Sequence, residues 1–453
     1  MDKDTVMSNA VKQFDSYDYY IDKKIKNDIE EYRKGQFAIS FTDENGNPLK
    51  DVKVKIRQTS HEFKFGCTTF YLDQFEEKEK NKLYRQKFAD IFNCGVVPLY
   101  WDTLEPSEGH PRFESDCAKI SRRPPVDDAV KFCTDNNMSV KGHCLVYNSF
   151  QPDWISNDNR ILKMQIERRV KAISDRYETA FECVDVINEM ISIYKNCYKG
   201  NSMRNMQLAD ERDHEKWAFD LCKRYFPNSR LFWNEGGFES FGNAYKGYRS
   251  FYYMELQRQL SMGVPIEGIG MQYHLYSPKY VPEGSVNFQN ICNPLRIADV
   301  LDCYGDFNLP IHISEVSVPS WSNEEFDEQN QADMVKRLYS LWFSSKNVSS
   351  VIWWNFADGT AYETENYLFA GLIRNDCSEK PAYKVLNDLI NKEWHTELEA
   401  TVDSRLNFRG FYGNYEIEAV YGDKKTVKSL RLFKENTGFD NRICDFRNIQ
   451  IKL

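Results

Sequence analysis

Eight short apolar runs recur between residues 63 and 358, and a polar stretch of helix-like composition follows each of them. The runs begin at Phe63, Val96, Val140, Cys183, Arg230, Gly268, Pro310 and Ser350. Their spacing of about forty residues is what one strand, one helix and two loops require. Eight such units close into a barrel of parallel strands. The sequence therefore predicts an α/β fold, a (β/α)8 TIM barrel with insertions, over residues 61–393.

The residues before and after the barrel follow other patterns. Residues 1–35 predict a helix, and residues 37–60 predict a β-hairpin in which alternating apolar residues flank a turn at residues 45–48. Residues 394–453 predict strands without helices. We therefore expect residues 1–60 to form an N-terminal region whose strands pack with the C-terminal ones. Together these strands would make a small accessory β-domain beside the barrel.

The charge pattern restricts the partners of the chain. Its 453 residues carry a formal net charge of −9, without a basic stripe of the kind that neutralises phosphates. No stretch is apolar enough to span a bilayer, and the N-terminus lacks the basic and apolar regions of a signal peptide. We therefore expect no nucleic-acid or membrane partner, and a cytoplasmic location, or secretion if a leader has been removed. The sequence leaves the oligomeric state open.

Polar side chains gather where the apolar runs end, and barrels carry their active sites at the C-terminal ends of the strands. These residues are His143, Asn148, Asn188, Glu189, Asn234, Glu235, Gln272, His274, Glu315, Trp354 and Asp358. A glycosidase needs one carboxylic acid to protonate the leaving oxygen and a second carboxylate to attack the anomeric carbon. Glu189 and Glu315 fall on the fourth and seventh runs, nearly opposite each other across a small barrel. They are the predicted pair, although spacing alone does not exclude Glu235.

Other functions fit parts of this pattern. Each glutamate could instead form a structural ion pair at the barrel rim. A metal-dependent barrel hydrolase also uses strand-end histidines and carboxylates, but the first run, FKFGCTT, has no His pair and no HxxxH or HExxH spacing occurs near the site. A non-catalytic carbohydrate-binding protein would not need both Glu189 and Glu315. We therefore expect an enzyme without a metal or another cofactor, whose partner is an oligosaccharide or glycoside.

At the segments VDVINE, GMQYHL and HISEV the sequence resembles glycoside hydrolase family 10, the xylanase family. The hallmark of that family is an Asn-Glu acid/base on strand four and a nucleophilic Glu on strand seven. The segments WDTLEPSEG, KGHCLVYNSFQPDW and SVIWWNFAD resemble its strands two, three and eight. The resemblance covers residues 63–390, and it implies a retaining β-glycosidase on a TIM barrel.

Carried over to the matching positions, the resemblance implies Glu189 as the acid/base and Glu315 as the nucleophile. Asn188 would bind the 2-hydroxyl of the reacting sugar, and His274 would contact the nucleophile with Gln272 nearby. The other substrate-binding residues that the resemblance implies are Trp101, His143, Asn148, Trp354 and Tyr362.

The chain departs from the family where the next sugar outward would bind. Tyr100 occupies the position of a family lysine, and no Glu-Asn pair precedes it. Asn148 replaces a second strand-three histidine, and Tyr362 stands in place of a second strand-eight tryptophan. We therefore expect cleavage of β-glycosidic bonds in xylan-derived or related oligosaccharides, or in a different or decorated β-glycoside. We also expect low activity on polymeric xylan relative to short β-linked oligosaccharides or aryl glycosides.

Overall fold

Eight parallel strands close into a barrel in the structure, a computed structural model that describes residues 5–191, 211–280, 291–432 and 448–453. The strands are β3 (Lys64–Thr68), β4 (Cys94–Pro98), β5 (Ser139–His143), β7 (Phe181–Asn188), β8 (Arg230–Glu235), β9 (Gly268–His274), β10 (Ile311–Ser317) and β11 (Val348–Trp353). Each pairs with the next in this order, and β11 pairs with β3. A two-residue strand, β6 (Val146–Tyr147), adds to the end of β7. The predicted (β/α)8 barrel is confirmed.

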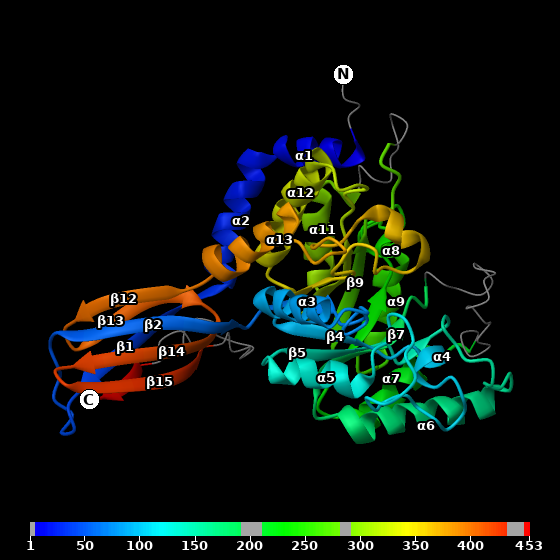
Figure 1. The fold of residues 1–453 in the computed structure, drawn as a ribbon, viewed down its shortest axis with the longest axis horizontal. Coiled ribbons are helices and arrows are strands. Elements are labelled where there is room, and N and C mark those ends of the chain that lie inside the picture. The colour runs from blue at the N-terminus through cyan, green and yellow to red at the C-terminus, as the bar shows by residue number, and fades with distance from the viewer. Residues whose placement is uncertain (1–4, 192–210, 281–290, 433–447) are drawn as a thin grey trace.

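Helices surround the barrel strands (Figure 1). They are α3 (Lys78–Ile91), α5 (Val126–Asp135), α6 (Asn159–Tyr177), α7 (His214–Tyr225), α9 (Phe251–Ser261), α11 (Pro294–Gly305), α12 (Glu325–Ser344) and α13 (Pro381–Asp388), with short helical segments α4 (Trp101–Leu104), α8 (Gly237–Ser240), η2 (Glu363–Leu368) and η3 (Leu389–Glu393). In α12, residues Met334, Leu338 and Leu341 recur three or four positions apart and are all buried. This spacing places them on one face of the helix, which packs into the barrel core.

An accessory β-domain lies beside the barrel and combines both ends of the chain (Figure 1). One sheet has the order β13 (Arg405–Phe411), β1 (Lys34–Thr42), β16 (Asn448–Lys452), and the other has the order β12 (Glu397–Val402), β2 (Val52–His61), β14 (Gly413–Tyr421), β15 (Lys424–Leu432). Alternate residues of both sheets, among them Phe41, Ile56 and Ile417, share one buried cluster. The expected accessory β-domain of N- and C-terminal strands is confirmed, although residues 433–447 of the C-terminal region lie outside the described part.

The predicted hairpin over residues 37–60 is wrong. The chain does reverse, because Asp43 accepts hydrogen bonds from the backbone N–H groups of Asn45 (2.9 Å) and Asn47 (2.8 Å). However, β1 then pairs with β13 and β16, whereas β2 pairs with β12 and β14 in the opposite sheet. The alternation of apolar residues specified which face of each strand is buried, and this requirement is met equally well when the two strands belong to facing sheets.

The helix expected over residues 1–35 is divided into α1 (Val6–Asp15) and α2 (Asp18–Tyr32). Val6, Met7 and Phe14 of α1 are buried in the cluster of the barrel rather than in that of the β-domain. The N-terminal helices therefore cover the barrel, next to α12 (Figure 1).

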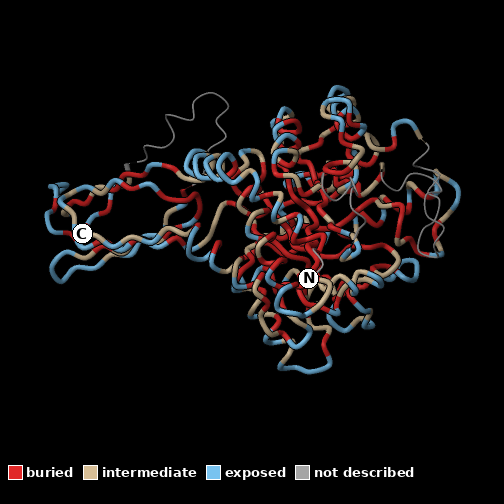
Figure 2. Tube along the Cα trace, turned by 90° about the horizontal axis from the view of Figure 1, so that it is seen from above, coloured by how far each residue is buried: buried red, intermediate tan, exposed pale blue. Residues whose placement is uncertain are grey.

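An aromatic cluster joins the β-domain to the barrel. Trp394 stacks on Phe343, with ring centroids 4.2 Å apart, and on Phe65, with centroids 5.8 Å apart. Phe411 of the β-domain also contacts Phe343, with ring centroids 6.0 Å apart. Because β2 leads directly into the N-terminal end of β3, the β-domain is attached at the end of the barrel opposite the predicted active site. Figure 2 shows buried residues throughout the barrel body.

Substitution of Trp394 should destabilise the protein strongly. The side chain is 2% exposed, so Trp394→Ala leaves a large cavity between the barrel and the β-domain. We expect the free energy of unfolding to fall by about 3 to 5 kcal/mol in urea denaturation followed by circular dichroism. Met164→Ala, at a side chain that is 70% exposed on α6, is the control. A loss no larger than that of the control would show that the cluster does not stabilise the junction.

Candidate active site

Glu189 and Glu315 come together at the C-terminal end of the barrel. Glu189 directly follows β7, and Glu315 lies in β10. The Gln272 amide bridges them, because its Nε2 donates to Oε1 of Glu189 (2.6 Å) and to Oε1 of Glu315 (3.1 Å). Their environments differ, since Glu315 is 3% exposed whereas Glu189 is half-buried. The two predicted carboxylates thus share one neighbour and face one space.

Local irregularities of the backbone aim these carboxylates. Glu189 has a positive φ of 51°, in the left-handed region, and its N–H donates to the carbonyl oxygen of Asn234 (2.9 Å). At Glu315, the register of β10 shifts against β9 between Ile313 and Glu315. A bulge of this kind changes the side to which a strand residue points. Both glutamates therefore leave the regular alternation of their strands at the active-site end.

Three neutral donors hold the Glu315 carboxylate. Asn234 Nδ2 (2.8 Å) and Gln272 Nε2 (3.1 Å) donate to Oε1, and His274 Nε2 lies 3.0 Å from Oε2. Burial lowers the pKa of His274 to about 4, so its ring is neutral at physiological pH. A carboxylate only accepts, so Nε2 carries the proton and Nδ1 accepts from the hydroxyl of Ser317, 2.9 Å away. The carboxylate is thus fixed without a cation in direct contact.

Asn234 also connects Glu315 to a second predicted residue. Its Nδ2 donates to Oδ1 of Asn188 (2.7 Å) as well as to Glu315, and its Oδ1 accepts from the hydroxyl of Ser314. Asn188 is 2% exposed and adjoins Glu189 in the chain. The two glutamates are therefore linked a second time, through the Asn188–Asn234 pair.

His143 lies behind Glu315 in a buried charged network. Its Nε2 is 3.1 Å from the Tyr100 hydroxyl and 3.9 Å from Oε1 of Glu315, and its Nδ1 is 2.9 Å from Asp185. Lys141 pairs with Asp185 at 2.8 Å, and both side chains are 1% exposed. Burial alone would raise the pKa of Asp185, but the Lys141 ammonium and the His143 hydrogen bond hold it below its ordinary value.

Burial raises the pKa of Glu315 above its usual range. His143 opposes this shift, and the nearby carboxylate of Glu189 adds to it. Burial and the neighbouring carboxylate thus both favour the protonated form of Glu315, more than in an exposed glutamate.

Aromatic rings form one wall of the site. Trp354 packs with Phe70 and Tyr100 in a separate cluster and lies 5.6 Å from the ring of His143 and 5.7 Å from that of His274. This wall offers a flat apolar surface of the kind on which a sugar ring can rest.

Tyr147 contacts the other carboxylate. Its hydroxyl, at the end of β6, donates to Oε2 of Glu189 over 2.7 Å. This contact could not be predicted from the sequence, because β6 has only two residues and leaves no strand pattern. Asn234 and Asp185, by contrast, were visible as polar residues within apolar runs.

The remaining predicted residues contact other side chains. Asn148 donates to the sulfur of Met190 (3.4 Å), next to Glu189, and Tyr362 packs edge-on against Phe150 at 5.6 Å. Trp101 donates from its indole N–H to Glu105 (3.0 Å).

The indole of Trp101 packs against a side chain of α6. It is 6% exposed and packs against Trp154 and the guanidinium of Arg169. In this arrangement it supports the loop after β4, so we do not place it in the sugar site.

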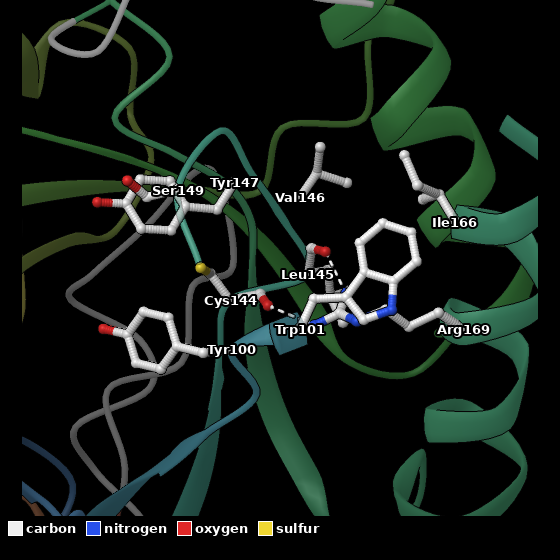
Figure 3. Close-up of a pocket in the computed structure, with 9 residues that line it drawn as sticks. All are labelled: Tyr100, Trp101, Cys144, Leu145, Val146, Tyr147, Ser149, Ile166 and Arg169. Atoms are coloured by element: carbon white, nitrogen blue, oxygen red, sulfur yellow. Dashed lines mark hydrogen bonds between the residues drawn. The ribbon is translucent and has the colours of Figure 1, made fainter. Parts of the chain in front are cut away.

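A small cavity of about 10 Å³ lies on the α6 side of Tyr100 and Tyr147 (Figure 3), with room for about one water molecule. Arg169 reaches into this region and donates to the carbonyl oxygens of Leu99, Cys144 and Leu145. Neither Glu189 nor Glu315 lines the cavity. We therefore assign it to the packing of the strand-three segment and not to the active site.

The described residues contain no group of three or more His, Cys, Asp or Glu side chains arranged to hold a metal ion. Within the same residues, no helix is long and apolar enough to cross a membrane.

Glu235, which spacing alone left as an alternative to one of the pair, has a supporting position. It is fully buried, and its Oε1 accepts from the N–H of Ile191 (2.9 Å) and from the indole of Trp233 (3.1 Å). It therefore anchors the chain just after Glu189. Burial raises its pKa to about 7 from an ordinary value of 4.5.

This shift predicts a pH dependence of stability. Between pH 4.5 and 7 the folded protein retains a proton on Glu235 that the unfolded chain releases, so stability is lost as pH rises through this range. Glu235→Gln keeps the accepting oxygen and removes the titration. Relative to wild type, we expect the variant to gain roughly 3 kcal/mol between pH 4.5 and pH 7 in urea denaturation. Stability profiles that run parallel would contradict the assignment.

The chain is similar to known proteins over most of its length. Residues 57–389 match the family model for glycosyl hydrolase family 10. Anti-sigma-I factor RsgI6 of Acetivibrio thermocellus is 25% identical over 397 residues, which are 86% of this chain and 45% of the relative. Endo-1,4-beta-xylanase 2 of Arabidopsis thaliana is 26% identical over 427 residues, 90% of this chain and 34% of the relative. The chain thus spans less than half the length of either.

A solved structure shows the same fold. Xylanase 10B from Thermotoga petrophila, in complex with xylobiose, superposes with a TM-score of 0.57 at 20% identity. The superposition covers 73% of this chain and 95% of that structure. With the family model matching residues 57–389, these comparisons show that the chain belongs to glycosyl hydrolase family 10.

Proposed function

We propose that the chain is a retaining glycoside hydrolase that cleaves β-glycosidic bonds in xylan-derived or related oligosaccharides by double displacement. The observation that carries this proposal is the pairing of Glu189 with Glu315 through the single amide of Gln272. Two carboxylates that share a neighbour can act on opposite ends of one glycosidic bond. Several relatives are named endo-1,4-beta-xylanases, and these names favour xylan-type sugars as the substrate class of this chain.

Glu315 is the better nucleophile. Its three donors fix both oxygens, so the attacking oxygen is already oriented toward the anomeric carbon. Attack forms a bond between Glu315 and that carbon while the bond to the leaving oxygen breaks. Glu189 transfers its proton to this oxygen in the same step.

Glu189 suits the exchange of protons. It is half-buried, so a water molecule can reach it after the leaving group departs. It then takes a proton from that water, whose oxygen attacks the anomeric carbon and releases the carboxylate of Glu315. The hydroxyl of Tyr147 holds Oε2 of Glu189 throughout, which leaves Oε1 near Gln272.

The other residues bind the sugar. The Oδ1 of Asn188 accepts from Asn234, so its amide nitrogen is free to donate to the 2-hydroxyl. Trp354 supports the ring, with His143 and His274 at its edges. Asn148 and Tyr362 are assigned to outer contacts.

A non-catalytic carbohydrate-binding protein is the competing function. Binding alone does not require a buried carboxylate, which costs free energy, to face a second carboxylate. The experiment below separates the two functions, since a binding protein would release no product.

The test compares single substitutions on two substrates. We expect Glu315→Ala to lower kcat/KM by at least about 10⁴-fold on both a β-linked oligosaccharide and a nitrophenyl β-glycoside. Glu189→Ala should lose about 10²- to 10⁴-fold on the oligosaccharide but much less on the nitrophenyl glycoside, whose leaving group needs no proton.

The control is Glu182→Ala, which removes an exposed carboxylate from the other end of β7, where it pairs with Lys64. Assays after exhaustive chelation test the metal-dependent alternative. Equal losses for Glu189→Ala on both substrates would overturn its assignment as the acid.

A further inference from the structure

Two adjacent arginines, Arg122 and Arg123, are buried beside the active site on the segment between α4 and α5. Each is 7% exposed. The guanidinium of Arg123 lies 4.1 Å from the centroid of the Tyr100 ring, and the Tyr100 hydroxyl contacts His143 next to Glu315. A single aromatic ring and one imidazole therefore separate this cation from the proposed nucleophile.

Arg122 reaches the same wall from the other side. Its Nη1 donates to Oδ1 of Asn355 (2.8 Å) and to the carbonyl oxygen of Thr360. Asn355 follows Trp354 in the chain, and the Phe70 ring, which contacts Trp354 at 5.0 Å, lies 5.4 Å from both guanidinium groups. The two arginines thus border the aromatic wall on which a sugar would rest.

Neither arginine forms an ion pair with a carboxylate in the part of the chain that the structure describes. Among the residues that the structure describes, no carboxylate oxygen lies within 4.0 Å of either guanidinium. Within the described ranges, the Nε atoms of both are buried without a hydrogen-bond partner. Glu365 is one of the nearby acids. Its carboxylate accepts hydrogen bonds from the Asn355 amide (2.9 Å) and from the Tyr276 hydroxyl (2.9 Å).

Asp102 is the other acidic group that faces Arg123. It too has a buried carboxylate oxygen without a hydrogen-bond partner, so it does not bridge the distance to the guanidinium. Two like charges side by side in a buried place are costly unless an anion compensates them. In this chain the missing anion is not supplied by the described side chains.

We propose that Arg122 and Arg123 form an anion-binding subsite that takes the carboxylate of a uronic acid carried by the substrate. This inference rests on the proposed function. The planar fork of a guanidinium matches the two oxygens of a carboxylate. A neutral sugar would leave both charges uncompensated, so the subsite selects acidic oligosaccharides over neutral ones. The chain carries a net charge of −9, which repels an acidic substrate at long range. The attraction must therefore come from the two arginines close to the bound sugar.

The test uses two β-linked oligosaccharides with the same backbone, one of which carries a uronic acid substituent. For wild type we expect a higher kcat/KM on the acidic substrate, and a ratio of acidic to neutral that falls with added salt. Arg123→Gln should lower this ratio at least about tenfold. Arg123→Lys, which keeps the charge, should retain part of the preference.

Arg160→Gln, at an exposed side chain paired with Asp158, is the matched control and should leave the ratio unchanged. If Arg123 only supports the fold, Arg123→Gln should lower kcat/KM on both substrates by the same factor and leave the ratio of acidic to neutral unchanged. That result would overturn the subsite. A wild-type ratio of one or less would overturn it as well. If wild type cleaves neither substrate, the proposed function fails instead.

If the arginine variants unfold, the test measures substrate binding instead of kinetics and uses Glu315→Gln, which keeps both arginines. Glu315→Gln should bind the acidic oligosaccharide more tightly than the neutral one in calorimetry, and this difference should shrink as salt rises. Equal affinities would contradict the subsite whatever the behaviour of the arginine variants.

Discussion

Burial of the Glu315 carboxylate is the constraint on which the rest of the site depends. A carboxylate that is 3% exposed is stable only if hydrogen bonds replace the water it has lost. Its donors come from neighbouring strands, Asn234 from β8 and Gln272 and His274 from β9. Because β8, β9 and β10 are neighbouring parallel strands of the barrel, their C-terminal ends meet at this one carboxylate. The fold and the chemistry therefore meet at this residue.

The layer around these donors fixes their protonation and orientation. The hydroxyl of Ser317 orients His274, and the hydroxyl of Ser314 orients Asn234. Asp185 holds His143 in place and is itself paired with Lys141. The contacts of Ser314 and Asp185 are buried, so solvent does not compete for them, and the contact of Ser317 is partly buried. A substitution in this layer would act through the geometry of Glu315 rather than through contact with a sugar.

The sequence predicted the parts of the molecule that repeat or that lie at strand ends. The rhythm of the apolar runs located all eight barrel strands, and the polar residues that end them included both glutamates, Gln272 and His274. A strand that is buried on both faces appears in the sequence as an apolar run, whichever strands pair with it. Its position can therefore be predicted from the local sequence alone.

What the sequence did not predict depends on distant parts of the chain. The partners of β1 and β2 are set by C-terminal strands, so the turn between them suggested a hairpin that does not form. Trp101 turns toward Arg169 because α6 lies behind it. Arg122 and Arg123 lie in a loop without periodicity, and only the folded structure shows that they are buried together.

The central claim, a covalent role for Glu315 opposite Glu189, is tested most directly by trapping the intermediate. A 2-deoxy-2-fluoro glycoside with a good leaving group slows both steps, and the glycosyl-enzyme accumulates because its formation is the faster one. Peptide mapping by mass spectrometry should then find one sugar attached to Glu315, and no label on a Glu315→Gln variant. A label on Glu189 or Glu235 would contradict the account. So would rapid release of product of inverted configuration without any labelled protein.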